Sequence, residues 1–289
     1  MSLADVLVSP FTDYAFMKRA LVAAMALAIS GTPLGVLMML RRMTLVGDAL
    51  SHAILPGIAV AFFVAGLSLW AMTLGGVIAA LIVAGLAAFL SRLTDLKEDA
   101  AFALLYLLSL AVGVALISIK GGSAHLMHVL FGNILAIDQD TLMLVTGVCC
   151  LSLFTIAALY RRFVIDGFDG AFMRTAGAQR RGVGLMGLVF FALLMINLVA
   201  SFQAMGTLMA LGLMVLPALA AHFWAKTIDG MMPLAMGLGA VAAYAGLVLS
   251  YHTAIPSGPA IVLVAGGMTV VSAVLGRFGS VVACVGRKN

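Results

Sequence analysis

The stretch RRMTLVGDALSHAILPG, residues 41–57, places a carboxylate and an imidazole beside a long apolar run. Asp48 and His52 are four residues apart, so on a helix their side chains lie on one face, one turn from each other. A carboxylate oxygen and an imidazole nitrogen are suitable ligands for zinc, manganese or iron. Because burying such groups in a membrane is costly unless each has a partner or a function, we expect Asp48 and His52 to bind metal. The alternative is that Asp48 caps a helix that begins at Ala49.

The composition is that of a membrane protein. The 289 residues are 64% hydrophobic and 9% charged, with a mean hydropathy of +1.21, whereas soluble domains carry roughly 25% charged residues. No room is left for a sizeable soluble domain, so residues 1–289 are expected to form a single transmembrane domain. The net charge of +5 is better explained by basic loops on one side of the membrane than by binding to nucleic acid.

The apolar runs predict an all-α fold of nine transmembrane helices, since about twenty apolar residues span a bilayer. The runs cover residues 20–40, 49–66, 69–90, 100–119, 141–160, 184–202, 204–224, 233–250 and 258–276. None of them contains Asp, Glu, Lys or Arg. Recurrent glycines favour close helix packing, and Pro33, Pro56 and Pro217 should bend or break their helices.

The basic residues predict the orientation, because lysine and arginine concentrate in cytoplasmic loops. If the amino terminus lies outside, then Lys18, Arg19 and Lys120 lie outside and all other lysines and arginines lie inside. We therefore predict a multi-pass protein of the cell membrane, with an external amino terminus and a cytoplasmic carboxyl terminus.

The longer outside connection, residues 120–139, alternates apolar and polar groups, which is typical of a short helix at the membrane interface. His125 and His128 are three residues apart and share a face if this segment is helical. They are candidate outer polar residues and metal ligands. The alternative is that both are ordinary polar groups at the level of the lipid headgroups.

The longer inside connection, residues 161–183, has the features of a short amphipathic helix that docks on another protein. Asp169 is a suitable N-cap, and Gly177 is a suitable stop for a helix of about two turns. The segment mixes charged and apolar side chains, among them Phe168, Phe172, Met173 and Arg174. The alternative is a basic loop held by phospholipid headgroups.

Three polar residues in the last third of the chain are candidates for a transport pathway. Asn197 and Gln203 are uncharged, and the alternative is that they form hydrogen bonds between helices. His222 lies at a predicted cytoplasmic helix end, where it is either an exit ligand or an interfacial polar residue. The three cysteines show neither metal-ligand spacing nor a disulfide framework.

Sequence motifs of ATP hydrolysis and of membrane enzymes are absent. The chain contains no Gly-x-x-x-x-Gly-Lys-Ser/Thr phosphate loop and no His-Glu-x-x-His. It also lacks a Gly-x-Ser-x-Gly with a plausible His and Asp. We therefore do not expect an enzyme, and ATP hydrolysis would need a partner.

Residues 40–57, which extend the opening stretch by one leucine, resemble the signature of the zinc, manganese and iron permease subunits of ATP-binding-cassette importers. Three further segments resemble the same family in the expected order: residues 130–135, 206–218 and 256–263. The resemblance covers most of the chain, from about residue 20 to residue 276. The outer segment slightly favours the manganese branch over the zinc branch.

This resemblance implies a fold related to the cobalamin and iron-siderophore importers, the type II permease fold, in which the permease is a homodimer. It further implies that manganese, zinc or iron is transported and that no cofactor is bound permanently. A cytoplasmic ATP-binding-cassette ATPase would bind ATP and dock on a short helix of each permease, which the segment from Phe168 to Gly177 resembles. An extracytoplasmic protein would deliver the metal. His222 departs from the family, where Arg or another polar residue is expected.

Two other transport functions remain as alternatives. A permease for a metal chelate, such as a siderophore or a cobalamin-like molecule, needs a wide cavity and no direct metal ligands, so Asp48 and His52 argue against it. A metal transporter without an ATPase usually places several ionisable groups at mid-membrane, and the apolar runs hold almost none.

Overall fold

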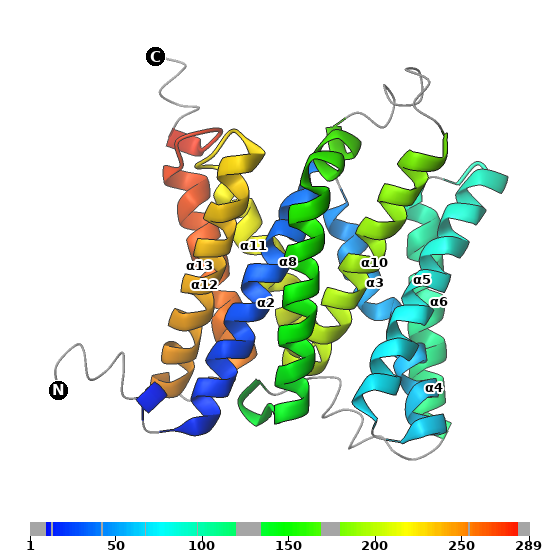
Figure 1. Ribbon diagram of the computed structural model, residues 1–289, viewed down its shortest axis with the longest axis horizontal. Coiled ribbons are helices and arrows are strands. Elements are labelled where there is room, and N and C mark those ends of the chain that lie inside the picture. Colours follow the sequence, from blue (N-terminus) through cyan, green and yellow to red (C-terminus); the bar gives the residue numbers. More distant parts are fainter. Residues whose placement is uncertain are drawn as a thin grey trace.

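The computed structural model describes residues 10–12, 14–41, 43–66, 68–96, 98–119, 134–168, 180–253 and 255–282. In these ranges the chain is helical apart from short turns (Figure 1). The long helices are α2 (Ala15–Leu40), α3 (Thr44–Ala53), α4 (Leu55–Ala65), α5 (Leu69–Leu93), α6 (Glu98–Ile119), α8 (Gln139–Phe168), α10 (Arg180–Met205), α11 (Thr207–His222), α12 (Ile228–Thr253) and α13 (Ser257–Leu275), with a short 3₁₀ helix η1 (Ile134–Ala136) before α8.

Seven helices in the described ranges are long and apolar enough to cross a membrane, with α3 and α4 counted together from Gly47 to Ala65. Two more apolar helical stretches, Ala100–Leu116 and Met209–His222, are shorter. Every predicted apolar run falls on one of these helices, so the predicted all-helical membrane fold is confirmed. The number of nine crossings stays a prediction.

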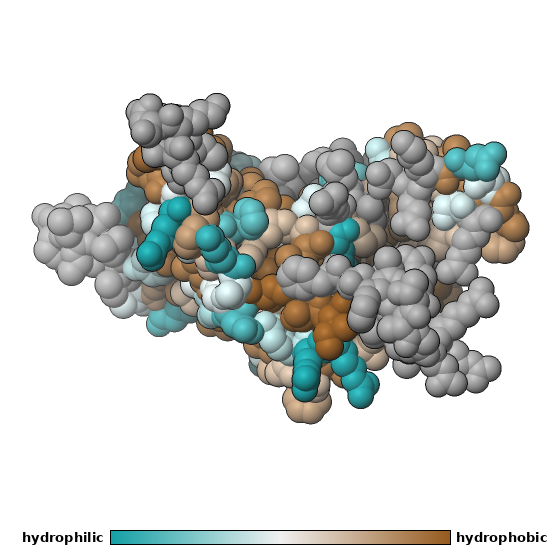
Figure 2. All heavy atoms as spheres, turned by 90° about the horizontal axis from the view of Figure 1, so that it is seen from above, coloured by the Kyte–Doolittle hydropathy of each residue, from teal (hydrophilic) through white to brown (hydrophobic). Residues whose placement is uncertain are grey.

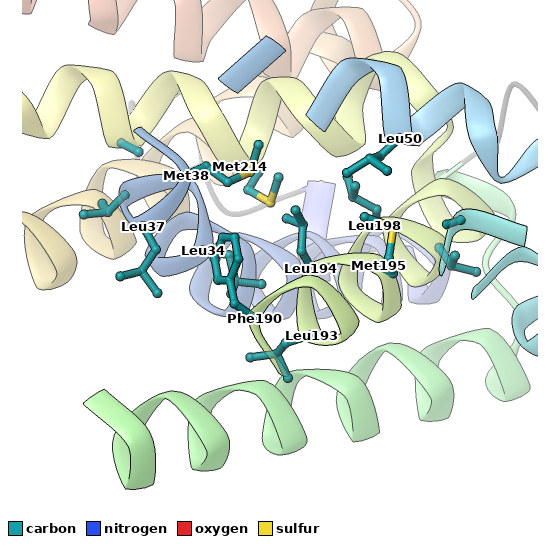
Figure 3. Close-up of a cluster of buried hydrophobic side chains, with 14 of the residues drawn as sticks. Leu34, Leu37, Met38, Leu50, Phe190, Leu193, Leu194, Met195, Leu198 and Met214 are labelled. Atoms are coloured by element: carbon teal, nitrogen blue, oxygen red, sulfur yellow. The ribbon is translucent and has the colours of Figure 1, made fainter. Parts of the chain in front are cut away.

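The core lies where α2 packs against α10, α11 and α12. Its side chains are large, apolar and almost completely buried, because neighbouring helices bury one another's apolar faces. Figure 3 shows the members Leu34, Leu37 and Met38 of α2, Leu50 of α3, Phe190, Leu193, Leu194, Met195 and Leu198 of α10, and Met214 of α11. At one end of this core the guanidinium of Arg41 lies 4.1 Å from the centre of the Phe190 ring.

Glycines mark the closest helix contacts, as the sequence predicts. A Cβ atom on Gly57 of α4 would lie 2.1 Å from the carbonyl oxygen of Gly75 of α5, and one on Gly35 of α2 would lie 2.1 Å from the carbonyl oxygen of Met214. Any larger side chain at these positions would overlap backbone atoms. Small residues thus let the helices approach closely, which is how helices associate in membranes.

The three prolines act differently from one another. Pro56 lies in the first turn of α4, next to the break at Ile54 that separates α3 from α4. By contrast, α2 continues through Pro33 and α11 continues through Pro217. The predicted bend or break is therefore a break at Pro56, whereas the helices are not broken at the other two, where the surrounding helices bury the segment. A bend at Pro33 and Pro217 stays a prediction.

The inside connection is shorter than predicted. Helix α8 continues through Arg161 and Arg162 to Phe168, and α10 begins at Arg180. The prediction that residues 161–168 belong to a loop is wrong, since the helix extends beyond the apolar run into the basic residues.

Basic residues collect at one end of the helices. Figure 1 shows α2, α8, α11 and α13 all ending at the upper side. Arg41, Lys226 and Arg277 follow three of these helix ends, whereas Lys18 lies near the start of α2, at the opposite side. Figure 2 looks onto the upper side and shows hydrophilic residues (teal) around an apolar centre. This asymmetry agrees with a cytoplasmic upper side, and the orientation stays a prediction.

Candidate functional site

Helix α3 holds both residues of the predicted metal pair. It begins at Thr44, with Met43 in the N-cap position. Asp48 is therefore the fifth helical residue and not a cap, and the alternative that it caps a helix beginning at Ala49 is wrong. Asp48 and His52 lie one turn apart on the same face.

This face of α3 is the more open one. Asp48 is exposed and His52 is half-buried, whereas Leu50 and Ala53 are fully buried in the core. Asp48 has no hydrogen bond or ion pair with the described part of the chain.

The helix break next to His52 has a chemical cause. Pro56 has no N–H group, so it cannot donate to the carbonyl of His52 as a helical residue would. Helix α6 covers the break: the Ser109 hydroxyl donates to the carbonyl oxygen of Ala53 at 3.2 Å. On the same helix, the ring of Tyr106 stacks on the imidazole of His52, with ring centres 6.3 Å apart and planes inclined by 29°.

Asn197 is buried on α10 and is used within the chain. Its amide nitrogen donates to the Ser152 hydroxyl of α8 and to the carbonyl oxygen of Leu193, the latter at 3.0 Å. This contact is the hydrogen bond between helices that was the alternative to a pathway role. Ser152, which sequence reasoning missed, gives no signal in the sequence beyond being a hydroxyl in an apolar run.

Gln203 lies near the other end of α10 and faces α5. Its Oε1 atom lies 3.1 Å from the Thr73 hydroxyl, whose one proton is shared with the carbonyl oxygen of Leu69 at 2.8 Å. The buried Nε2 atom of Gln203 has no hydrogen-bond partner among the described residues. The structure therefore brings Gln203 together with Thr73 of α5. It does not bring Gln203 together with Asn197, which contacts α8 instead.

The remaining predicted site residues are separate from α3 or are not described. His222 is the last residue of α11; it is exposed and meets Phe223 edge-on, with ring centres 5.9 Å apart. Phe168 ends α8. The other predicted residues lie outside the described residues: His125, His128, Asp169, Phe172, Met173, Arg174 and Gly177.

The described part of the chain contains no group of three or more His, Cys, Asp or Glu side chains placed to hold a metal ion. One α3 helix offers two ligands, whereas zinc prefers four, and harder cations such as magnesium and calcium take six or more. The arrangement can therefore bind a passing cation only with ligands from elsewhere, such as water or another chain.

Comparisons with known proteins agree with the resemblance seen in the sequence. Residues 13–276 match the family described as the ABC 3 transport family. The chain is 32% identical over 251 residues to the manganese import system permease protein ScaB of Streptococcus parasanguinis, with 87% of each chain covered. It is 30% identical over 255 residues to the chelated iron transport system membrane protein YfeD of Yersinia pestis, covering 88% of this chain and 83% of that protein.

Solved structures share the fold. PsaBC from Streptococcus pneumoniae, solved in complex with a Fab, superimposes with a TM-score of 0.87 at 28% sequence identity, and the match covers 100% of both chains. A metal-chelate type ABC transporter in an inward-facing conformation superimposes with a TM-score of 0.68 at 17% identity, covering 88% of this chain and 84% of that one. The family predicted from residues 40–57 is therefore confirmed: the chain is a multi-pass protein of the cell membrane that belongs to the ABC 3 transport family.

Proposed function

We propose that the chain is the membrane-spanning permease subunit of an ATP-driven importer of a divalent transition metal, with manganese as the first candidate and iron or zinc next. The observation that carries this proposal is the pair Asp48 and His52, one turn apart on the open face of α3. The family match and the relatives named as manganese and iron permeases support it.

In this proposal the metal passes α3, and Asp48 and His52 replace part of its water shell. Two ligands per chain suit transit, because an ion that is held by a complete ligand set leaves slowly. A homodimer would bring two such pairs to one pathway. Asn197 and Gln203 then serve mainly to hold α10 against α8 and α5, and His222 remains a candidate at the exit.

ATP binding and hydrolysis belong to a partner in this proposal, since the chain has no phosphate-binding loop. A cytoplasmic ATPase would dock near residues 168–177, at the basic end of the helices, and an extracytoplasmic protein would deliver the metal. Nine crossings with a cytoplasmic basic end would place the amino terminus outside. Closure of the ATPases would then change the packing of the helices around the pathway.

A chelated metal is the second candidate cargo, and one observation favours it: YfeD, whose name refers to chelated iron, is a relative at 30% identity. Asp48 and His52 argue against a chelated cargo, because the chelator itself supplies the ligands of the metal and would leave these two residues without a role. Inhibition of metal uptake by free manganese therefore separates the two cargoes, because a permease for a chelate would not recognise the bare ion.

The test is metal uptake by the complete importer with Asp48→Asn. Asparagine keeps the size of aspartate but removes the charge, so we expect manganese uptake to fall by at least about tenfold while the amount of permease in the membrane stays the same. The matched control is Asp140→Asn, which removes an equally exposed carboxylate from the first turn of α8 and should leave uptake unchanged. Uptake of manganese, iron and zinc at the parental rate by Asp48→Asn would refute the ligand role of Asp48 and show that the pathway uses other groups.

A further inference from the structure

One face of α6 is directed at the break between α3 and α4. Tyr106, Ser109 and Gly113 are spaced by three and four residues, so they share this face. Tyr106 stacks on His52, and Ser109 donates to the carbonyl oxygen of Ala53 at 3.2 Å. A Cβ atom on Gly113 would lie 3.1 Å from the nitrogen of Pro56, so α6 approaches the break closely at this point.

The opposite face of α6 has a different composition. Leu104, Leu107 and Leu108 are between half and two-thirds exposed and present aliphatic side chains to the surroundings of the helices, as a lipid-facing surface does. The tyrosine, the serine and the glycine thus lie on the face of α6 that contacts α3 and α4.

The contact meets a physical need of the break. Where Pro56 interrupts the helix, the last carbonyls of α3 lose their regular donors, and in a membrane these groups need a partner from protein. Ser109 supplies one. The orientation of the half-buried imidazole of His52 is a separate matter, because its side-chain torsions are not fixed by the backbone; the only described ring that stacks on it is that of Tyr106.

We propose that Tyr106 is a positioning residue for metal transport: its ring holds the imidazole of His52 in the orientation that faces the metal, and Ser109 holds the end of α3 that carries this imidazole. The inference rests on the proposed function, because it gives His52 the role of ligand. Tyr106 itself touches no metal. Outer residues that orient a metal-binding histidine commonly change metal affinity by about 10- to 100-fold when they are removed.

The test compares the concentration dependence of manganese uptake in the full importer for the parent, Tyr106→Leu and Tyr106→Phe. Tyr106→Leu should raise the KM for manganese by about tenfold and change the ratio of manganese to zinc uptake, with a smaller effect on the maximal rate. Tyr106→Phe keeps the ring and should restore both values to within about threefold of the parent. The matched control Leu108→Ala removes an exposed side chain from the opposite face and should change neither.

Ser109→Ala provides a second measurement that does not alter the ring contact, and it should raise the KM in the same direction by less than Tyr106→Leu does. If Tyr106→Leu does not accumulate in the membrane, Tyr106→Met takes its place. Methionine has nearly the same volume as leucine, and its side chain is more flexible. A parental KM and metal ratio in the variant without the ring would overturn the inference. So would a Tyr106→Phe chain as impaired as Tyr106→Leu, because the hydroxyl and not the ring would then act.

Asp48→Asn, measured in the same assay, separates this inference from the proposed function. If Asp48→Asn loses uptake while Tyr106→Leu behaves like the parent, the inference fails and the proposed function stands. If Asp48→Asn transports manganese at the parental rate, the proposed ligand role of Asp48 fails, and with it the part of the proposed function on which this inference rests. If the parental importer takes up no manganese, iron or zinc, the proposed function itself fails.

Discussion

The polar side chains of α10 and those of α3 lie in contrasting environments. On α10, Asn197 is buried and donates to Ser152 of α8, and Gln203 accepts from Thr73 of α5. On α3, Asp48 is exposed without a hydrogen bond or ion pair to the described chain, and His52 stacks on the ring of Tyr106 and forms no hydrogen bond or ion pair with the described residues. The first pair is uncharged and bonds to neighbouring helices, although Asn197 Oδ1 and Gln203 Nε2 are buried without a partner among the described residues. The second pair is ionisable, with Asp48 exposed and His52 half-buried.

If Asp48 and His52 are metal ligands, as proposed, this contrast separates polar residues that hold helices together from polar residues that bind the metal. Charge alone does not make the distinction: Asp229 at the start of α12 accepts a hydrogen bond from Tyr160 of α8, and Asp138 accepts one from the backbone of Thr141 at 2.9 Å. Carboxylates with such partners contribute to structure. Asp48 has no such partner among the described residues and lies one turn from an imidazole, which makes it a candidate for function.

The largest effect is expected for His52→Ala. Loss of the imidazole should reduce manganese uptake by at least about tenfold, because removing a ligand costs at least as much as removing its support. The melting temperature of the detergent-purified permease should change little, since the half-buried imidazole forms no hydrogen bond or ion pair with the described residues. A lowered melting temperature with normal uptake per folded molecule would show that His52, like Asn197, stabilises the helix packing and does not bind the metal.

Asn197→Leu should show the opposite pattern. The variant leaves the buried Ser152 hydroxyl without its partner, which should destabilise the permease by about 1 kcal/mol and lower the melting temperature by about 2–4 °C. Uptake per folded molecule should remain at the parental level. Adding Ser152→Ala to Asn197→Leu should lower the melting temperature little further. A second decrease as large as the first would show that the two residues stabilise the permease independently.

Thr73→Val should have a smaller effect of the same kind. It removes the donor to Gln203 but keeps the shape of the side chain, so we expect a loss of about 0.5 kcal/mol, which is typical for one hydrogen bond between membrane helices. Thermal unfolding in detergent measures it, with Thr155→Val as the control, since the Thr155 hydroxyl bonds only to its own helix at Leu151. Loss of metal uptake in Thr73→Val would instead place Gln203 in the pathway.

The smallest effect concerns Asp138, which precedes α8 as an N-cap. Hydrogen bonds from the Thr141 side chain and backbone, partly opposed by burial, lower the pKa of the Asp138 carboxyl below its ordinary value. The stabilisation is therefore present above the ordinary pKa of about 3.9 and is lost as the pH falls below it. Melting temperatures from pH 7 to pH 3 should decline less at the acid end for Asp138→Asn, which still caps but does not titrate. Equal slopes for both chains would contradict a role for this carboxylate in acid sensitivity.

The sequence by itself determined the features that depend on local spacing. Apolar runs of about twenty residues become helices wherever they occur in a membrane protein, and a separation of four residues puts Asp48 and His52 on one face of any helix. The match of residues 40–57 to a family signature is likewise a property of the order of residues alone. These predictions needed no knowledge of which helices are neighbours.

Only the tertiary structure decided which of these features matter and to what they are joined. The sequence treats Pro33, Pro56 and Pro217 alike, but only Pro56 lies at a break, because the neighbours of the other two hold their helices intact. Asn197 gains its partner from a helix 45 residues away along the chain, and His52 gains the ring of Tyr106 from α6. The physical reason is that a helix fixes the direction of its own side chains, whereas hydrogen-bond and ring contacts between helices depend on how several helices pack together.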